Sequence, residues 1–303
     1  MKEFEKSIKI IVIGTGEFTI RLIAQIVKDE RFKVLGVVCD ESVENEVINN
    51  YREAVKKLGV ENVFSLEDRC LANADIIFCS EYRKLIAKEY VEKYNIINSH
   101  AGILPKYHGF SANPWAIING EDEIGYTIHK MDEKMDHGAI YYVGKIPIRR
   151  EQTYADVYDD MLNDMERNIC DILVRVHKHE LLPETQEGHG GVYTSRFFPA
   201  MGDLKDFDKE SEYIYNLYRS MAKPHGTGVY FYYKGKKYYP GKVQTGVDVG
   251  VENYIGIPGK VVNCELGEIW VKTKDNVVIL SEIIGENEEA VEENYFRIGN
   301  RLG

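Results

Sequence analysis

The strongest constraint on the fold is the regular alternation of apolar runs and helical segments in the first hundred residues. The runs at 7–14, 32–39 and 75–79 are almost continuously apolar, as expected for buried strands. The intervening segments at 18–28 and 43–58 carry apolar residues at helical spacing. This alternation predicts an α/β fold, a Rossmann-like, doubly wound and mostly parallel sheet with helices on both faces. Ligands of such sheets collect beyond the carboxyl ends of the strands.

The pattern continues to about residue 177 and then changes. Further expected elements are strands at 62–64, 95–100, 124–131 and 140–148 and helices at 85–94, 111–119 and 153–177. Beyond one more helix at 211–221, short strands separated by Gly and Asn turns predict a small, open, OB-like β-barrel. We therefore expect a catalytic domain at 1–190, a linker at 191–206 and a C-terminal β domain at 207–303.

Composition narrows the class of protein. The chain of 303 residues suits two domains, it has no apolar run of the ~18 residues that a membrane span needs, and its charged N-terminus is unlike a signal peptide. Its five cysteines are scattered and never form a Cys-x-x-Cys pair, and the His177–His179 pair lacks a nearby third ligand, so no metal site is expected. The net charge of −11 lowers the expectation of a nucleic-acid partner, although it does not exclude a local basic patch. We expect a cytoplasmic protein with no membrane partner.

The first strand–turn–helix contains Gly14-Thr-Gly16, two of the three glycines of a dinucleotide-binding fingerprint. Asp40 falls near the place of a ribose-binding acid, but Thr19 replaces the third glycine. A dinucleotide site and a plain tight turn both remain open, and the first would make the chain an oxidoreductase or a nucleotide sensor.

A second polar group lies at the end of the strand at 95–100. Asn98 and His100 are two residues apart, so their side chains share one face of the strand. An amide can stabilise an oxyanion, and an imidazole titrates near neutral pH and can accept a proton from an amine. Asp136 is a candidate carboxylate to orient the imidazole. These are the groups needed for acyl transfer to an amine, but a strand-end Asn-x-His is also common as a turn cap.

Other residues compete for these roles. Asp122 and Asp132 are alternative carboxylates, and Asp136-His137-Gly138 could be only a turn between strands. We expect three further histidines to be structural or superficial: His108, His129 and His137.

The order of these motifs resembles that of a known family. Asn98-Ser-His100 followed by Ala101-Gly-Ile-Leu-Pro-Lys-Tyr-His-Gly109 resembles the Asn-x-His-x-Ser-Leu-Leu-Pro-x-x-x-Gly signature of formyltransferases that use N10-formyltetrahydrofolate. Gly125-Tyr-Thr-Ile-His129 and Asp136-His-Gly-Ala-Ile140 resemble the family's downstream motifs. The part after Tyr193 resembles members with an appended open barrel.

The resemblance implies a catalytic trio of Asn98 as oxyanion donor, His100 as general base and Asp136 as its partner. It implies that the formylated folate is held by two loops, at Tyr82, Arg83, Leu85, Ile86, Met131 and Asp132. Acceptor contacts are expected at Lys106, His108, Gly109, Asn113 and Arg196.

The acceptor is expected to be a nucleotide-linked amino sugar (dTDP-, UDP- or GDP-linked), used in making lipopolysaccharide or another surface glycan. Tyr82-Arg-Lys-Leu-Ile86 resembles the enzyme that formylates UDP-4-amino-4-deoxy-arabinose, and the acidic stretch at 40–46 would repel tRNA phosphates. The family commonly has Tyr-Arg-Gly where this chain has Tyr107-His108-Gly109, so the acceptor contacts differ here. Two other reactions remain open: transfer to methionyl-tRNA, and hydrolysis that releases formate. The chain could also form a homodimer.

Overall fold

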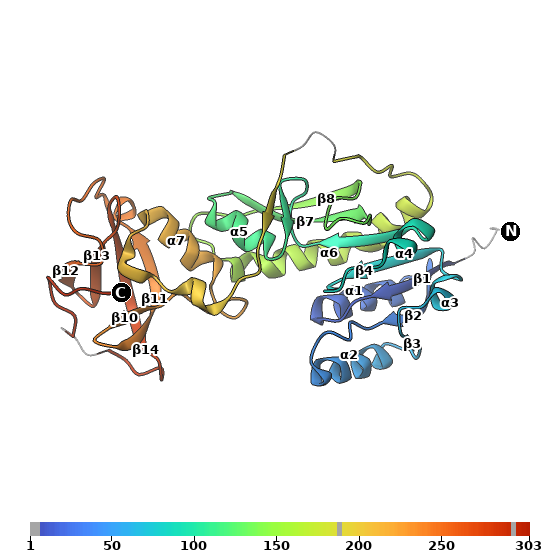
Figure 1. Cartoon of the computed structure of the whole chain (residues 1–303), viewed down its shortest axis with the longest axis horizontal. Helices are drawn as coiled ribbons and strands as arrows, with labels where there is room; N and C mark the ends of the chain where they lie inside the picture. Colours follow the sequence, from blue (N-terminus) through green and yellow to red (C-terminus); the bar gives the residue numbers. More distant parts are fainter. Residues whose placement is uncertain (1–6, 187–189, 292–294) are drawn as a thin grey trace. The chain divides into compact units, whose positions relative to one another are not determined.

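The computed structural model describes residues 7–186, 190–291 and 295–303 (Figure 1). They form two compact units: the described residues within 1–112, 124–146 and 159–195 belong to the first, and those within 113–123, 147–158 and 196–303 to the second. The second unit thus takes two short segments from within the predicted catalytic domain.

The first unit is built on a seven-stranded sheet with the order β3-β2-β1-β4-β5-β7-β8. Its strands are β1 (Ile8–Ile13), β2 (Phe32–Val38), β3 (Val63–Phe64), β4 (Ile76–Ser80), β5 (Ile96–His100), β7 (Glu123–Lys130) and β8 (Ile140–Pro147). Its helices are α1 (Glu17–Lys28), α2 (Asn45–Lys57), α3 (Asp68–Leu71) and α4 (Lys88–Lys93), and two helices have residues in both units: α5 (Ala112–Ile118) and α6 (Tyr154–His177). The pairs from β3 to β5 are parallel, whereas β7 runs antiparallel to β5. The predicted α/β class and the mostly parallel sheet are confirmed.

Apolar strands and one-sided helices explain this sheet. The β1 residues from Ile10 to Ile13 are fully buried, and α1 turns Leu22, Ile23 and Ile26 into the core. Thr153 caps α6 as predicted: its backbone N–H donates to Asp156 Oδ2 and its Oγ1 accepts from the Asp156 N–H.

A small parallel pair of strands was not predicted. β6 (Tyr107–Gly109) pairs with β9 (Val192–Thr194), with His108 opposite Tyr193. Strands of three residues carry no measurable period, which explains why the sequence pattern missed them. The pair brings the segment after 190 back to the loop that follows β5.

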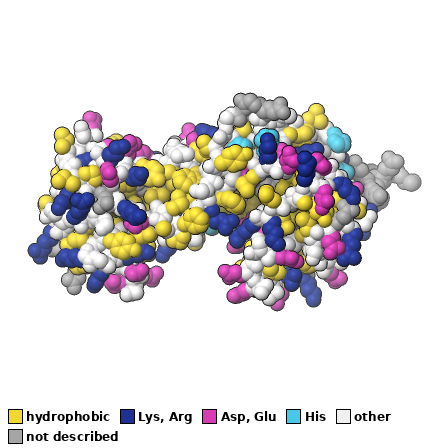
Figure 2. Space-filling model, viewed as in Figure 1, with side chains coloured by type: hydrophobic (Ala, Val, Ile, Leu, Met, Phe, Trp, Pro, Cys, Tyr) yellow, Lys and Arg dark blue, Asp and Glu magenta, His cyan; other side chains and the backbone are white. Residues whose placement is uncertain are grey.

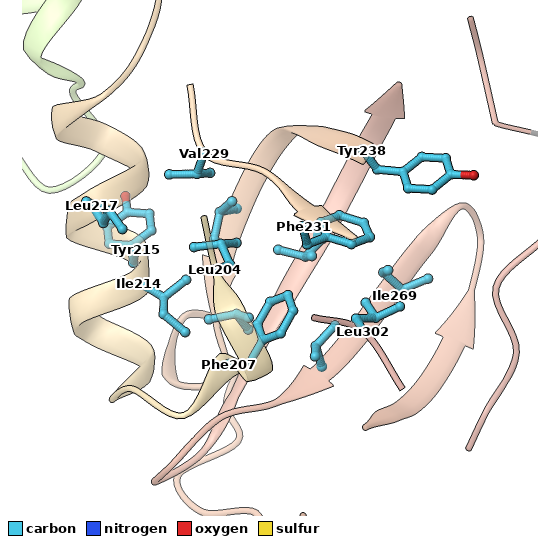
Figure 3. Close-up of a cluster of buried hydrophobic side chains, with 14 of the residues drawn as sticks. Leu204, Phe207, Ile214, Tyr215, Leu217, Val229, Phe231, Tyr238, Ile269 and Leu302 are labelled. Atoms are coloured by element: carbon cyan, nitrogen blue, oxygen red, sulfur yellow. The ribbon is translucent and has the colours of Figure 1, made fainter. Parts of the chain in front are cut away.

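The second unit contains a five-stranded antiparallel sheet with the order β10-β11-β14-β13-β12. Its strands are β10 (Phe231–Tyr233), β11 (Lys236–Thr245), β12 (Val261–Glu265), β13 (Glu268–Lys272) and β14 (Val277–Gly285), and its helices are α7 (Ser211–Ser220), η1 (Pro199–Gly202), η2 (Lys205–Phe207) and η3 (Val247–Val249). Helix α7 packs Ile214 and Leu217 into a cluster with Phe231 and Val229 (Figure 3). The predicted C-terminal β domain is confirmed in class.

Among the described residues, no helix is long and apolar enough to cross a membrane. All five cysteines are free thiols.

Candidate active site

The candidate site lies at the carboxyl end of β5. Asn98 and His100 share a face, as predicted, and antiparallel β7 places His129 directly opposite Asn98 and Thr127 opposite His100. The loop between β7 and β8 then brings Asp136 to the same place, since one of its oxygens lies 3.4 Å from His100 Nδ1. The three residues proposed from the sequence therefore meet.

Both nitrogens of His100 have a partner. Its Nε2 lies 2.9 Å from the backbone oxygen of Tyr107, which can only accept a hydrogen bond, so Nε2 carries the hydrogen. In the neutral ring Nδ1 is then the basic nitrogen, and it faces Asp136 Oδ2. A proton taken up at Nδ1 would be stabilised by this carboxylate. The ring is only 7% exposed, so little water competes with that interaction.

Asp136 is held in an unusual backbone conformation. Its φ angle is 54°, in the left-handed region that few non-glycine residues adopt. The Gly109 N–H donates to Asp136 Oδ2 at 2.8 Å, and His129 Nε2 lies 3.8 Å from Oδ1. The Gly109 N–H thus holds the carboxylate, which lies beside the His100 and His129 rings.

His129 orients the amide of Asn98. Its Nδ1 lies 2.9 Å from the Lys130 backbone oxygen and therefore donates, which leaves Nε2 as an acceptor. Burial lowers the pKa of the His129 imidazole to about 4, so the ring stays neutral at neutral pH. Asn98 Nδ2, 3.1 Å away, donates one hydrogen to this nitrogen. The other N–H of the same amide is left to point elsewhere, as an oxyanion donor requires.

His129 was expected to be structural, and its place beside Asn98 and Asp136 is new. The sequence predicted the strand at 124–131 that contains His129, but not which residue of the neighbouring strand His129 faces. The direction and register of its pairing with β5 decide which residue faces Asn98, and neither could be read from the sequence.

The competing carboxylate Asp132 has a different partner. Its Oδ2 lies 2.7 Å from His137 Nδ1, and its Oδ1 accepts from the Lys134 N–H. Asp132 is therefore engaged within its own loop, and Asp136 is the carboxylate at His100.

The two loops expected to hold a folate share one hydrophobic cluster. Ile86 is buried in it, and Tyr82 and Met131 pack against it. Leu85, by contrast, is 76% exposed. Apolar side chains of this kind suit a flat heteroaromatic ring. No group of side chains suited to a metal ion occurs among the residues that the structure describes.

The glycine turn after β1 is filled by the protein itself. A Cβ at Gly14 would lie 1.6 Å from the Ser80 backbone oxygen, and one at Gly16 would lie 2.2 Å from Glu81 Oε2. Glu81 Oε2 accepts from the Thr19 N–H and the Thr19 hydroxyl, so a carboxylate occupies the N-terminus of α1.

Asp40 is likewise engaged. Its carboxylate is fully buried and accepts from the Ser42 and Arg83 backbone N–H groups. The geometry favours the tight-turn interpretation over a dinucleotide site.

The expected acceptor residues fall into two groups. Gly109 touches Asp136, Lys106 is exposed nearby in the chain, and His108 is buried with both ring nitrogens against backbone oxygens. Asn113 and Arg196 belong to the second unit, and their role stays a prediction.

Comparison with known proteins identifies the family. Residues 8–173 match the formyl transferase family, and residues 204–300 match the formyl transferase C-terminal domain. The chain belongs to the formyl transferase family and is a formyl-transferring enzyme.

Individual relatives differ in the acceptor that their names imply. A methionyl-tRNA formyltransferase of Caldanaerobacter subterraneus is 27% identical over 97% of both chains. An N-formyltransferase from Helicobacter canadensis, solved with folinic acid and dTDP-3-aminofucose, is similar in fold, with a TM-score of 0.65 at 20% identity over 90% of this chain and 98% of that one. HypX from Aquifex aeolicus also matches in fold, with a TM-score of 0.59 at 17% identity. The match spans 94% of this chain and 46% of HypX.

Proposed function

We propose that the protein transfers a formyl group from N10-formyltetrahydrofolate to the primary amine of a nucleotide-linked amino sugar. The observation that carries this proposal is the convergence of Asn98, His100 and Asp136 at one strand end, with the His100–Asp136 contact at 3.4 Å. Formyl transfer builds negative charge on the formyl oxygen and positive charge on the attacking nitrogen. Asn98 can stabilise the negative oxygen, and His100 can accept the proton of the positive nitrogen. Asp136 can then stabilise the protonated His100.

Each residue has a defined task. The N–H of Asn98 that does not bind His129 stabilises the developing oxyanion. His100 Nδ1 accepts the proton of the attacking amine, and Asp136 stabilises the resulting imidazolium. When bound, the folate supplies the formyl group, and the cluster of Ile86, Tyr82 and Met131 would hold its ring. Removal of the Asn98 donor is expected to lower kcat by about 100- to 1000-fold.

Two observations support a sugar as the acceptor. The loop after β2 and the first turn of α2 carry exposed Glu41, Glu44 and Glu46 beyond the carboxyl end of β2, and these carboxylates would repel a phosphate-rich macromolecule. The Helicobacter canadensis protein, which shares the fold, was solved with a dTDP-linked amino sugar.

Methionyl-tRNA is the second candidate acceptor, because relatives that match over the whole chain are named for it. The second unit also offers a basic surface: residues 213–247 contain five Lys but no Asp or Glu. Lys237 Nζ lies 4.0 Å from the ring centroid of Tyr230, and Lys223, Lys234 and Lys236 are exposed. Figure 2 shows Lys and Arg side chains on the visible face of this unit. Basic and aromatic side chains together suit RNA.

A competition assay separates the two acceptors. The enzyme is mixed with N10-formyltetrahydrofolate and either a panel of dTDP-, UDP- and GDP-linked amino sugars or methionyl-tRNA, and products are identified by mass spectrometry. Formylation of a sugar nucleotide supports the proposal. Formylation of methionyl-tRNA alone, with binding that weakens steeply with salt, contradicts the sugar assignment. Formate release that needs no acceptor would indicate a hydrolase.

A further inference from the structure

The left-handed backbone of Asp136 needs something to hold it. A non-glycine residue in this region is disfavoured and persists only when its surroundings fix it. Two side chains donate to the backbone around it. His108 Nδ1 and Gln186 Nε2 each lie 3.0 Å from the Asp136 backbone oxygen, and Gln186 Nε2 also lies 2.7 Å from the Gly138 oxygen.

His108 is itself tightly held. Its second nitrogen, Nε2, lies 2.8 Å from the Pro105 backbone oxygen, and its ring stacks on Tyr193 with a centroid distance of 4.8 Å. Because both backbone oxygens only accept, the two hydrogen bonds form together only when each ring nitrogen carries a hydrogen. The pairing of β6 with β9 makes that stack, since it sets His108 opposite Tyr193. The Thr194 hydroxyl donates to the His108 backbone oxygen and fixes the same strand from the other side.

This arrangement engages both nitrogens of the His108 ring within the protein. The ring is 5% exposed, and both nitrogens point at oxygens of the protein. The family resemblance placed an acceptor contact at this position, where arginine is common. The histidine of this chain is instead aimed at the backbone of the carboxylate that serves His100.

We propose that His108 and Gln186 are positioning residues that clamp the backbone of Asp136 and thereby aim its carboxylate at His100. The inference rests on the proposed function, which assigns His100 and Asp136 to the reaction. The clamp fixes the Asp136 oxygen from two sides, so that Oδ2 stays within 2.8 Å of the Gly109 nitrogen and 3.4 Å of His100 Nδ1. Misplacement by ~1 Å can cost about 100-fold in rate.

Two substitutions of His108 separate its two hydrogen bonds. An asparagine amide nitrogen lies about as far from the backbone as ring Nδ1, and a glutamine amide nitrogen about as far as ring Nε2. His108→Asn can therefore keep the bond to Asp136, whereas His108→Gln can keep only the bond to Pro105. We expect His108→Asn to retain kcat within about fivefold and His108→Gln to lose about 10- to 100-fold, with KM for donor and acceptor within about twofold in both.

A second variant covers the case in which the His108 variants fail to fold. Gln186→Met keeps the size of the side chain but removes both donated hydrogen bonds. It should lower kcat about as much as His108→Gln, again with KM nearly unchanged. His177→Leu, an exposed change in the last turn of α6, is the control and should leave kcat and KM as they are.

Hydrogen exchange tests the clamp without any acceptor. The Gly109 N–H is protected by its bond to Asp136 Oδ2, so NMR should show its exchange at least about tenfold faster in His108→Gln and Gln186→Met but not in His108→Asn. If the free enzyme shows this pattern while no acceptor is formylated, the proposed function fails and the clamp stands.

Two results would overturn the clamp. A raised KM for the acceptor at unchanged kcat would make His108 a substrate contact. Unchanged Gly109 exchange in folded Gln186→Met, or equal losses in the two His108 variants, would leave both residues with a packing role only.

Discussion

The contact between His129 and Asn98 gives a sharp prediction for the variant His129→Leu. Leucine fills similar space but cannot accept the hydrogen bond that Asn98 Nδ2 donates at 3.1 Å. A neutral hydrogen bond of this kind contributes about 1 kcal/mol net, which corresponds to about fivefold in rate. If the amide also turns away from the formyl oxygen, the loss approaches the ~100-fold expected for a missing oxyanion donor. We therefore expect kcat to fall by about 5- to 100-fold.

The assay is steady-state formyl transfer with the acceptor that the panel identifies, followed by mass spectrometry of the product. KM values should change by less than about threefold, because His129 is 2% exposed and its ring nitrogens face Lys130 and Asn98. The double variant Asn98→Ala/His129→Leu should be no slower than Asn98→Ala, because His129 acts through Asn98. His177→Leu again serves as the control.

Two outcomes would refute this reasoning. A folded His129→Leu enzyme with wild-type kcat would show that Asn98 does not need its partner. Additive losses in the double variant would show that His129 acts on the reaction by another route, for example through Asp136, whose Oδ1 lies 3.8 Å from it.

Three further predictions concern stability. The pKa of His129 is about 4 in the folded chain and about 6.5 in the unfolded chain, so the unfolded chain binds more protons between these pH values. The contribution of His129 to the free energy of unfolding, up to roughly 3 kcal/mol, is therefore present above pH ~6.5 and is lost as the pH falls toward 4. Urea unfolding should show this loss in the wild type and a smaller one in His129→Leu, and equal pH profiles would contradict the assignment. Glu81→Ala should lower the free energy of unfolding by about 1–2 kcal/mol, since the N-terminus of α1 loses the carboxylate that Thr19 binds; an unchanged urea midpoint would count against this cap. Phe231→Ala removes a fully buried ring from the cluster in Figure 3 and should cost about 3–5 kcal/mol, whereas a loss below about 1 kcal/mol would mean that the cluster repacks.

The sequence predicted the elements that carry a clear period. The apolar runs of the sequence form four strands of the first sheet: β1, β2, β4 and β5. The segments with apolar residues at regular helical spacing form α1 and α6. Burial drives both patterns, so a single sequence records them. The expected helix at 85–94 begins later, at Lys88, because the preceding loop runs over the cluster at Ile86.

The sequence predicted the site residues that belong to recognisable motifs, but not the contacts between them that depend on strand pairing. Asn98 and His100 share a face by strand geometry, and the resemblance identified Asp136 among three competing carboxylates. Contacts that depend on pairing could not be foreseen. The register of β5 with β7 brings His129 to Asn98, and β6 with β9 stacks His108 on Tyr193. Long-range pairing of this kind leaves no local pattern in the chain.

The most direct test of the central claim is a mass measurement of the acceptor after incubation with N10-formyltetrahydrofolate and wild-type enzyme, Asn98→Ala or His100→Asn. The account predicts a nucleotide-linked amino sugar that gains one formyl group with the wild type, and turnover lowered at least about 100-fold in both folded variants. Near-normal turnover in both variants would contradict the catalytic role given to this strand end.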